Sequence, residues 1–279
     1  RKDNPERRGN MSTVDNKGIN IHYETEGKGP PLVLMHGMGG SIDNWYRTGY
    51  VEALENDYRL ILIDSRGFGA SGKPHEVAAY SREAKISDVI AVLDDLGIPK
   101  THYWGYSMGA SIGWALGMLQ NDRVYSLVLG GYPVLPEHPS PDTVVRWESR
   151  AKLMRSGMDL YIAAVEMDHG PMPQEQRERL MANDGEAYAC QQLANLEWGV
   201  PNDAIKYMTA PALVYSGTED HEHPGFNNHE ITKSCAKVAP NAFFIPVPGH
   251  THGQTFQDKD FILPHATKFL AEMVAQTRK

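Results

Sequence analysis

The sequence has little cysteine and no long apolar segment. Its 279 residues include two cysteines, Cys190 and Cys235, which are too few for a framework of disulfides. We expect both to be free thiols in a reducing compartment, and therefore a cytoplasmic protein. No apolar run approaches the roughly 18 residues that a membrane-spanning helix requires. These absences argue against a disulfide-stapled fold and predict a soluble protein that does not act at a membrane.

Positive charge is also scarce. The chain has 27 lysines and arginines against 35 aspartates and glutamates, a formal net charge of −8. Because no basic stripe is present, we do not expect a nucleic acid or an anionic membrane surface as a partner. Histidines occur at His221–Pro224, His229, His250 and His252, but no HExxH or CxxC spacing accompanies them. We therefore expect no metal and no cofactor, and a small molecule as the partner.

Residues 1–10 differ in character from the rest of the chain. They are charged, contain Pro5 and Gly9, and lack the apolar region of a secretory signal peptide. We expect them to form a disordered extension ahead of Met11.

Strand and helix patterns alternate through most of the remaining sequence. Unbroken apolar runs such as Leu32–Met35 and Tyr58–Ile63 are typical of strands that are buried on both faces of a parallel sheet. The clearest helix has an N-cap at Ser81 and ends at Gly97. The alternation predicts an α/β fold with a mostly parallel central sheet and helices on both faces. Further strands are expected at 19–24, 102–104, 124–129, 212–215 and 241–245, and further helices at 44–54, 111–119 and 258–276.

One segment interrupts this alternation. Residues 132–209 show no strand pattern but carry helical patterns at 144–154, 158–167 and 174–182. We expect this segment to form a helical cap that is inserted between two strands and lies over their ends. The core would then comprise residues 11–131 and 210–279.

The stretch Gly105–Gly109 reads Gly-Tyr-Ser-Met-Gly, which fits the G-x-S-x-G pattern of a nucleophile elbow. In this motif a serine stands on a tight turn between a strand and a helix. Side chains at the two glycine positions would collide with neighbouring backbone. A strand-prone stretch precedes the motif and a helical pattern follows it, so Ser107 is the predicted nucleophile.

A serine hydroxyl needs a base that removes its proton and an acid that orients the base. Both are expected in loops after later strands, because ligands collect at the carboxyl ends of parallel strands. The loop after 212–216 offers Asp220, with Glu219 and Glu222 nearby. The loop after 243–247 offers two candidate bases, His250 and His252. Spacing alone does not choose among these residues.

The oxyanion of a tetrahedral intermediate needs hydrogen-bond donors that are already in place. Two backbone N–H groups are suitably positioned along the chain. One belongs to Met108, directly after the predicted nucleophile, and the other to Met38, in the glycine-rich loop His36–Gly40. We predict that these two groups form the oxyanion hole.

Together these motifs resemble the α/β-hydrolase fold serine hydrolases over nearly all of residues 18–276. The similarity is to the capped branch that holds small-molecule carboxylesterases, enol-lactonases, cofactor-free haloperoxidases and carbon–carbon bond hydrolases. The motifs that carry it are His36-Gly37, Asp64–Ser71, Gly105–Gly109, Gly217–Asp220 and Gly249–His252.

The resemblance implies Asp220 as the acid and His252 as the base, because in that family these residues follow glycine as G-x-x-D and G-x-x-H. It also implies structural roles for His36 and Asp64. Epoxide hydrolases and haloalkane dehalogenases of this fold carry aspartate at the elbow, where this sequence has Ser107.

We therefore predict a carboxylesterase-like serine hydrolase that cleaves small to medium esters through an acyl-enzyme. Lactone or enol-lactone opening and carbon–carbon cleavage are alternatives, as is a ligand receptor of the same fold with slow turnover. Trp147, Met154 and Tyr161 of the expected cap are predicted to line the substrate pocket, and the methionines of the cap predict an adaptable apolar lining. Arginines of the same segment, such as Arg146 and Arg150, would instead favour a charged acid if they turned inward. The sequence does not indicate an oligomeric state.

Overall fold

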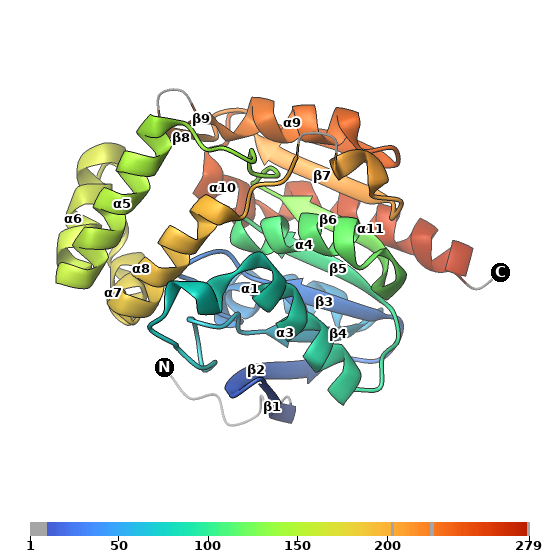
Figure 1. Ribbon diagram of the computed structural model, residues 1–279. Coiled ribbons are helices and arrows are strands. Elements are labelled where there is room, and N and C mark those ends of the chain that lie inside the picture. The colour runs from blue at the N-terminus through green and yellow to red at the C-terminus, as the bar shows by residue number, and fades with distance from the viewer. Residues whose placement is uncertain (1–9, 202–203, 224–225, 278–279) are drawn as a thin grey trace.

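A single eight-stranded sheet runs through the computed structural model, which describes residues 10–201, 204–223 and 226–277 (Figure 1). Its strands are β1 (Asn10–Asn16), β2 (Ile19–Glu26), β3 (Pro31–Met35), β4 (Arg59–Ile63), β5 (Thr101–Tyr106), β6 (Val124–Gly130), β7 (Ala212–Gly217) and β10 (Ala242–Val247). Their order is β1-β2-β4-β3-β5-β6-β7-β10. β1 and β2 are antiparallel to their neighbours. The other six strands of the sheet, β4, β3, β5, β6, β7 and β10, are parallel to one another. The predicted α/β fold with a mostly parallel sheet is confirmed.

Helices cover both faces of this sheet. The longer ones outside residues 132–209 are α3 (Arg82–Asp95), α4 (Met108–Leu119), α9 (Asn228–Val238) and α11 (Lys259–Thr277). Shorter ones are α1 (Asp43–Arg47), α2 (Tyr50–Leu54) and α10 (His252–Gln257), with 3₁₀ turns η1 (Val77–Tyr80) and η2 (Asn121–Arg123). β8 (His221–His223) and β9 (Phe226–Asn227) form a small separate hairpin.

The strand sequences divide the core into two layers because successive side chains of a strand point to opposite faces. Leu34 and Leu62 belong to a cluster that is completed by α2 and α11. Their neighbours Met35 and Ile63 belong to the other cluster, which includes side chains of α3 and α4. β5 is buried along its whole length, so its C-terminal end lies at a fixed place between the two layers.

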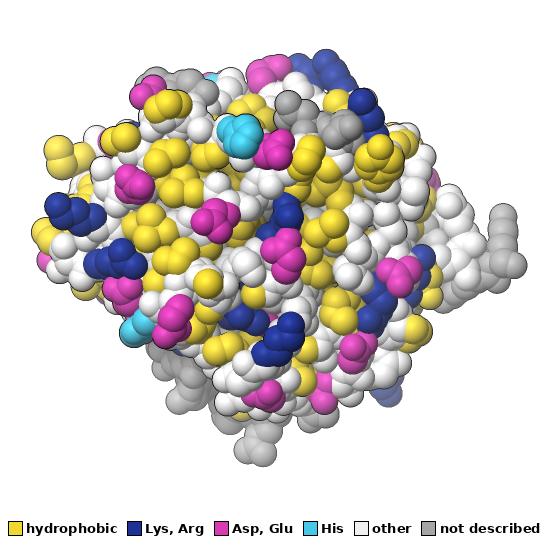
Figure 2. All heavy atoms as spheres, viewed as in Figure 1, with side chains coloured by type: hydrophobic (Ala, Val, Ile, Leu, Met, Phe, Trp, Pro, Cys, Tyr) yellow, Lys and Arg dark blue, Asp and Glu magenta, His cyan; other side chains and the backbone are white. Residues whose placement is uncertain are grey.

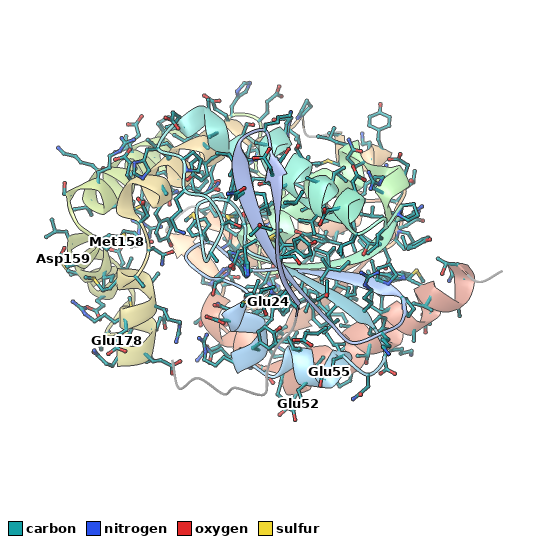
Figure 3. The ribbon with its side chains drawn as sticks, turned by 90° about the horizontal axis from the view of Figure 1, so that it is seen from below. Glu24, Glu52, Glu55, Met158, Asp159 and Glu178 are labelled. Carbon is teal, nitrogen blue, oxygen red and sulfur yellow. The ribbon has the colours of Figure 1, made fainter. Side chains whose placement is uncertain are left out.

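Residues 132–209 form a helical insertion between β6 and β7. Its helices are α5 (Pro141–Ser156), α6 (Met158–His169), α7 (Gln174–Met181) and α8 (Gly185–Ala194), followed by the 3₁₀ turns η3 (Asn195–Glu197) and η4 (Ala204–Tyr207). In Figure 1 these four helices lie together on the left, beside the sheet. Figure 3 shows the same separation from below, with Met158 and Glu178 of the insertion well away from Glu52 and Glu55 of the core.

Hydrogen bonds between the insertion and the core, and within the insertion, hold it in place. The indole N–H of Trp198 donates to the carbonyl oxygen of Tyr80 at 2.9 Å. Arg82, at the start of α3, donates to the carbonyl oxygens of Trp198 and Gly199. The beginning and end of the insertion also meet in a parallel bridge between Pro136 and Val200.

Several elements differ from the predicted ones. The helix expected at 44–54 is two short helices, because the chain turns at Gly49 with a φ of 77°. The sequence patterns did not predict β1, α8, α9, α10 and the β8–β9 hairpin, which are short or have mixed polar and apolar patterns. β1 begins at Asn10, the last residue of the predicted extension, and residues 1–9 lie outside the described part of the chain.

Both cysteines lie in the interior of the protein. Cys190 and Cys235 are both free and buried. Within the described ranges, no helix has the length and apolar character needed to cross a lipid bilayer.

Candidate active site

Ser107 occupies the turn between β5 and α4 in a strained backbone conformation. Its φ is 56° and its ψ is −119°, a region that residues other than glycine rarely adopt. A Cβ added to Gly105 would lie 2.2 Å from the carbonyl oxygen of Gly109, and one added to Gly109 would lie 2.3 Å from that of Met35. The two glycines thus allow the strand, the turn and the helix to approach closely enough for Ser107 to stand at the end of the sheet.

Three side chains form a continuous hydrogen-bonded path from this turn. His252 Nε2 lies 2.9 Å from Ser107 Oγ, and His252 Nδ1 lies 2.8 Å from Asp220 Oδ2. A carboxylate only accepts hydrogen bonds, so Nδ1 carries the proton and Nε2 is free to accept from the serine hydroxyl. The Asp220 side chain is 1% exposed and that of His252 is 38% exposed, so the ring is open to a substrate while the carboxylate is shielded from water.

The loops that carry Asp220 and His252 are held together by their backbones. The N–H of Glu219 donates to the carbonyl oxygen of His250 at 3.0 Å, and that of Thr218 donates to Val247. β7 and β10 are adjacent and parallel, so both loops leave the sheet at the same edge.

The competing candidates in these loops point elsewhere. The Nδ1–H of His250 donates to the carbonyl oxygen of Pro248 at 2.7 Å, and its Nε2 lies 3.0 Å from Asp258. Glu219 is exposed and its carboxylate accepts from Thr218. The side chain of Glu222 lies outside the described part of the structure.

Two backbone N–H groups near Ser107 are available as oxyanion donors. A Cβ placed on Gly37 would lie 3.0 Å from the Cβ of Ser107, so the loop that contains Met38 runs directly beside the serine. Met108 is the first residue of α4, where N–H groups have no partner within the helix. Within the described ranges, neither the Met38 nor the Met108 N–H donates to another protein group.

The same loop contacts the helical insertion at Gly39. Asn183 Nδ2–H donates to the carbonyl oxygen of Gly39 at 3.2 Å. A Cβ added to Gly39 would lie 2.7 Å from the hydroxyl oxygen of Tyr188, so this hydroxyl occupies the space that a side chain would need. The loop is therefore packed between Ser107 on one side and α8 on the other.

Buried polar groups brace the loops behind the site. His36 Nδ1–H donates to the carbonyl oxygen of Gly37 at 2.7 Å, its Nε2 accepts from the N–H of Ser65 at 3.0 Å, and burial lowers the pKa of its ring. Burial acts to raise the pKa of Asp64, but hydrogen bonds from His22 and from the N–H groups of Ala70 and Ile42 bring it below its usual value. His36 and Asp64 thus support the loops, as the resemblance implied, and do not reach Ser107.

Part of the chain matches a known protein family and curated relatives. A family model described as the alpha/beta hydrolase fold matches residues 30–172, just over half of the chain. The chain belongs to the α/β hydrolase fold family. An epoxide hydrolase 2 from Siraitia grosvenorii is 32% identical over 129 residues, which are 46% of this chain and 40% of that protein. The chain thus spans less than half the length of the curated relatives that it matches.

Solved structures of other α/β hydrolases match over almost the whole chain. A thermophilic esterase from Thermogutta terrifontis has a TM-score of 0.80 at 22% identity, covering 94% of this chain and 98% of that one. The enol-lactonase from Burkholderia xenovorans has a TM-score of 0.74 at 23% identity, covering 95% and 99%. At these identities the likeness establishes the fold.

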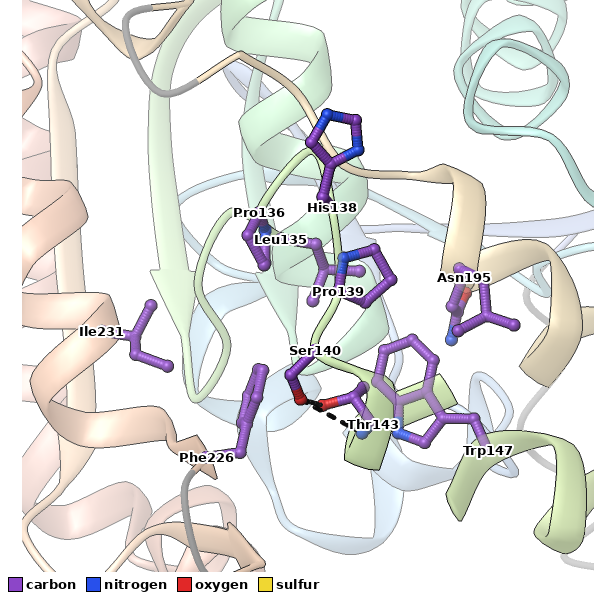
Figure 4. Close-up of a pocket in the computed structure, with 11 residues that line it drawn as sticks. Leu135, Pro136, His138, Pro139, Ser140, Thr143, Trp147, Asn195, Phe226 and Ile231 are labelled. Atoms are coloured by element: carbon purple, nitrogen blue, oxygen red, sulfur yellow. Dashed lines mark hydrogen bonds between the residues drawn. The ribbon is translucent and has the colours of Figure 1, made fainter. Parts of the chain in front are cut away.

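In this α/β hydrolase a pocket of about 270 Å³ lies between the helical insertion and the core (Figure 4). Ser107 does not line this pocket, but a series of contacts between aromatic rings runs from the pocket to His252. Phe226 lines the pocket, and its ring stacks on that of Tyr132 with 6.2 Å between the ring centroids. The Tyr132 ring in turn packs edge-on against the His252 ring, with 6.4 Å between centroids. The lining residues are Leu135, Pro136, His138, Pro139, Ser140, Thr143, Trp147, Asn195, Leu196, Phe226 and Ile231.

The three residues predicted to line the substrate pocket have different positions. Trp147 lines it. Met154 and Tyr161 lie outside this pocket and are buried within the insertion, where the Tyr161 ring contacts that of Tyr188. They pack the helices against one another, which is the ordinary role of apolar side chains at helical spacing.

The expected methionine-rich lining is likewise incomplete. Met167 is 88% exposed and Met181 is 46% exposed, so both lie on the outer surface of the α/β hydrolase. Hydrophobic side chains are also visible over the left part of the surface in Figure 2, where Figure 1 places α5 and α6.

Two asparagines near the site were not predicted from the sequence. Asn228 Nδ2–H donates to Asp220 Oδ1 at 3.0 Å, and Asn195 lines the pocket beside Met38. Neither belongs to a motif that a single sequence would reveal. Among the described residues, no three histidine, cysteine, aspartate or glutamate side chains are arranged to hold one metal ion.

Proposed function

We propose that this α/β hydrolase cleaves small to medium, uncharged carboxylic esters through an acyl-enzyme. The observation that carries the proposal is the hydrogen-bonded path from Asp220 through His252 to Ser107. A serine in such a path can lose its proton to the imidazole as it attacks a carbonyl carbon.

The proposed reaction has two halves. In the first, Ser107 Oγ attacks the ester carbonyl while its proton moves to His252 Nε2, and the buried Asp220 carboxylate stabilises the resulting imidazolium. The N–H groups of Met38 and Met108 donate to the oxyanion. Collapse of the intermediate breaks the bond to the alkoxy oxygen, which takes the proton from His252 and leaves as the alcohol. In the second half, water attacks the acyl group with the same base and regenerates Ser107.

The identity of the nucleophile favours esters over epoxides, although the relative described above is named an epoxide hydrolase. If Ser107 opened an epoxide, it would form an alkyl ether. An ether has no carbonyl carbon for water to attack, so the enzyme would not turn over. An ester carbonyl instead gives an acyl-serine, which water can hydrolyse with help from His252.

The charges of the insertion favour a neutral substrate. The guanidinium groups of Arg146 and Arg150 face the carboxylate of Asp168, and that of Arg155 pairs with Glu186 at 2.9 Å. These carboxylates offset positive charge that would otherwise favour an acidic substrate. The wall of the pocket is mostly apolar, so it suits an uncharged acyl group.

The helical insertion acts as the cap in this proposal, and residues 11–131 with 210–279 form the catalytic core. Trp147 and Asn195 come from the insertion and line the pocket, while Phe226 and Ile231 come from the core. A bounded pocket between the two parts favours compact substrates over long lipid chains.

A fluorophosphonate probe and a substrate screen test the proposal. We expect the probe to attach once, at Ser107, and to abolish hydrolysis of p-nitrophenyl butyrate. The Ser107→Ala variant should neither react with the probe nor hydrolyse the ester, while its melting temperature shows that it is folded. A lactone panel run beside the esters tests ring opening, which uses the same steps with a tethered leaving group. Labelling at another residue, full activity of Ser107→Ala, or turnover of styrene oxide alone would refute the proposal.

A further inference from the structure

Asn195 places an amide in a pocket that is otherwise mostly apolar. It begins η3, directly after α8, and its side chain lines the pocket together with Trp147 and Leu196. Figure 4 shows it on the side of the pocket opposite Phe226 and Ile231. An amide at such a place can orient a ligand, because a few polar groups in an apolar pocket fix how the ligand binds.

A neighbouring glutamine sets the direction of this amide. Gln191, one helical turn earlier on α8, is fully buried, and its Nε2–H donates to Asn195 Oδ1 at 2.7 Å. With its oxygen engaged, Asn195 presents its nitrogen on the other side. That Nδ2 lies 3.9 Å from Met38 Sδ, and a thioether sulfur is a weak acceptor. The amide N–H groups therefore retain capacity for a stronger acceptor.

The contact with the Met38 side chain joins Asn195 to the loop whose backbone N–H is the proposed oxyanion donor. The Met38 N–H is a proposed donor to the reacting carbonyl oxygen, whereas the leaving alcohol must lie toward His252, which protonates it. We therefore assign a substrate group that reaches Asn195 to the acyl chain.

We propose that Asn195 is a specificity-determining residue that selects acyl chains carrying a second, uncharged oxygen acceptor a few bonds from the ester carbonyl. An ether, ketone or hydroxyl oxygen in that position accepts a hydrogen bond from Asn195 Nδ2–H. The inference rests on the proposed ester hydrolysis and extends it to the substrate class. A simple alkyl chain would fill the same space but leave the amide donor without a strong acceptor.

Isosteric substrates test this inference. p-Nitrophenyl pentanoate is compared with p-nitrophenyl ethoxyacetate and p-nitrophenyl 3-methoxypropanoate, in which an ether oxygen replaces one methylene. For each variant the measured quantity is the kcat/KM ratio of an ether substrate to pentanoate. Comparing this ratio between variants removes the intrinsic reactivity of each ester.

We expect the ratio for at least one ether substrate to be about three- to tenfold higher in the wild type than in Asn195→Leu, the effect of one neutral hydrogen bond. Asn195→Asp should lower the ratio similarly, because its carboxylate still accepts from Gln191 but cannot donate. Gln174→Leu, which removes an insertion amide that bonds to Glu178 outside the pocket, should keep the wild-type ratio. Melting temperatures establish that each variant is folded.

Unchanged ratios in both Asn195 variants, with pentanoate still hydrolysed, would overturn this inference and leave the proposed esterase activity intact. A change in Asn195→Asp that is absent from a folded Asn195→Leu would also overturn it, because the added charge would then be the cause. If Asn195→Leu does not fold, the kcat/KM ratio measured for Asn195→Asp decides whether the inference holds. No hydrolysis of any ester by the wild type would contradict both proposals.

Discussion

Asn228 donates a hydrogen bond to one oxygen of the Asp220 carboxylate, at 3.0 Å, while the other oxygen faces His252 at 2.8 Å. Asn228 is the first residue of α9 and is 3% exposed. Its amide fixes the rotation of the carboxylate, so that Oδ2 is directed at the imidazole. The backbone N–H of His229 also donates to the carbonyl oxygen of Asp220, which ties this loop to the start of the helix.

Replacing Asn228 should therefore impair the reaction without impairing ester binding. We expect Asn228→Leu to lower kcat about tenfold with little change in KM, as for the loss of one hydrogen bond of about 1.4 kcal/mol. The neighbouring Asn227 provides the control, because its side chain caps α9 by accepting from the N–H of Glu230 at 3.0 Å. Asn227→Ala should lower the free energy of unfolding by about 1 kcal/mol and leave kcat unchanged. A similar kcat in wild type and Asn228→Leu would show that the carboxylate needs no such support.

The two histidines of the 248–252 loop should respond differently to substitution. We expect His252→Ala to lower kcat by about a thousandfold or more, because among the described residues no other base is hydrogen-bonded to Ser107 Oγ. His250→Ala should change kcat far less, since His250 bonds to Pro248 and Asp258. Steady-state kinetics on one p-nitrophenyl ester measures both. Equal losses would mean that the imidazole of His252 is not the base.

Adding one methyl group at the elbow should damage the fold. In Gly105→Ala the new Cβ would lie 2.2 Å from the carbonyl oxygen of Gly109, so α4 must move away from β5. We expect a destabilisation of about 1–3 kcal/mol, as for an overpacked core, together with a loss of fluorophosphonate labelling at Ser107. Gly253→Ala is the matched control, because nothing lies within 4 Å of its Cβ position. In that variant we expect a stabilisation of about 0.4–1 kcal/mol, measured by urea unfolding. Equal stabilities of the two variants would contradict the argument.

A buried histidine should make the fold sensitive to acid. His102 on β5 is 1% exposed, its Nδ1 lies 2.8 Å from Ser126 Oγ, and burial lowers its pKa to about 4. Between pH 6.5 and pH 4 the unfolded chain therefore binds a proton that the folded chain does not, and stability falls as the pH falls. Over this interval the group accounts for a loss of about 3 kcal/mol. His102→Gln, which does not titrate, should lose correspondingly less stability in urea unfolding at pH 7, 5.5 and 4.5. An unchanged dependence on pH would place the acid sensitivity elsewhere.

The size of the pocket should limit the length of the acyl chain. A space of about 270 Å³ accommodates short or aromatic groups. On p-nitrophenyl esters we expect kcat/KM to peak at short chains and to fall steeply by about twelve carbons, since each buried methylene adds about 0.8 kcal/mol only where it fits. A maximum at long chains, or activation at an oil–water interface, would show that the helical insertion does not bound the substrate.

Local patterns in the sequence were sufficient to predict the strands of the sheet other than β1, most of the longer helices and the elbow. Gly105, Ser107 and Gly109 are adjacent in the chain, so the steric requirement of the turn is visible in their spacing. Asp220 and His252 were selected over their neighbours by family resemblance, and the structure places both within hydrogen-bonding distance in one path with Ser107. Their catalytic roles remain predictions until the variants are measured.

The surroundings of the site could not be predicted in the same way. The contact of Asn228 with Asp220 depends on how the β8–β9 hairpin returns the chain, and that hairpin has no clear sequence pattern. Met154 and Tyr161 have the composition of a pocket lining, but apolar residues at helical spacing serve equally well to join helices. Their absence from the lining of the pocket, which includes the equally buried Trp147, distinguishes the two roles.

Tyr188 and Asn183 of the helical insertion pack against Gly39, in the loop whose Met38 N–H we propose as an oxyanion donor. If the helical insertion swung away from the core to admit a substrate, the contacts of Tyr188 and Asn183 with Gly39 would be lost. The loop that carries the Met38 N–H would then lack both of these supports. For the oxyanion hole proposed above, opening of the insertion and stabilisation of the oxyanion are then mutually exclusive. A wide-open molecule would hydrolyse esters poorly even with the proposed catalytic residues Ser107, His252 and Asp220 in line. Substrate entry and catalysis are compatible when the substrate enters through a narrow opening while α8 stays packed against the loop at Gly39.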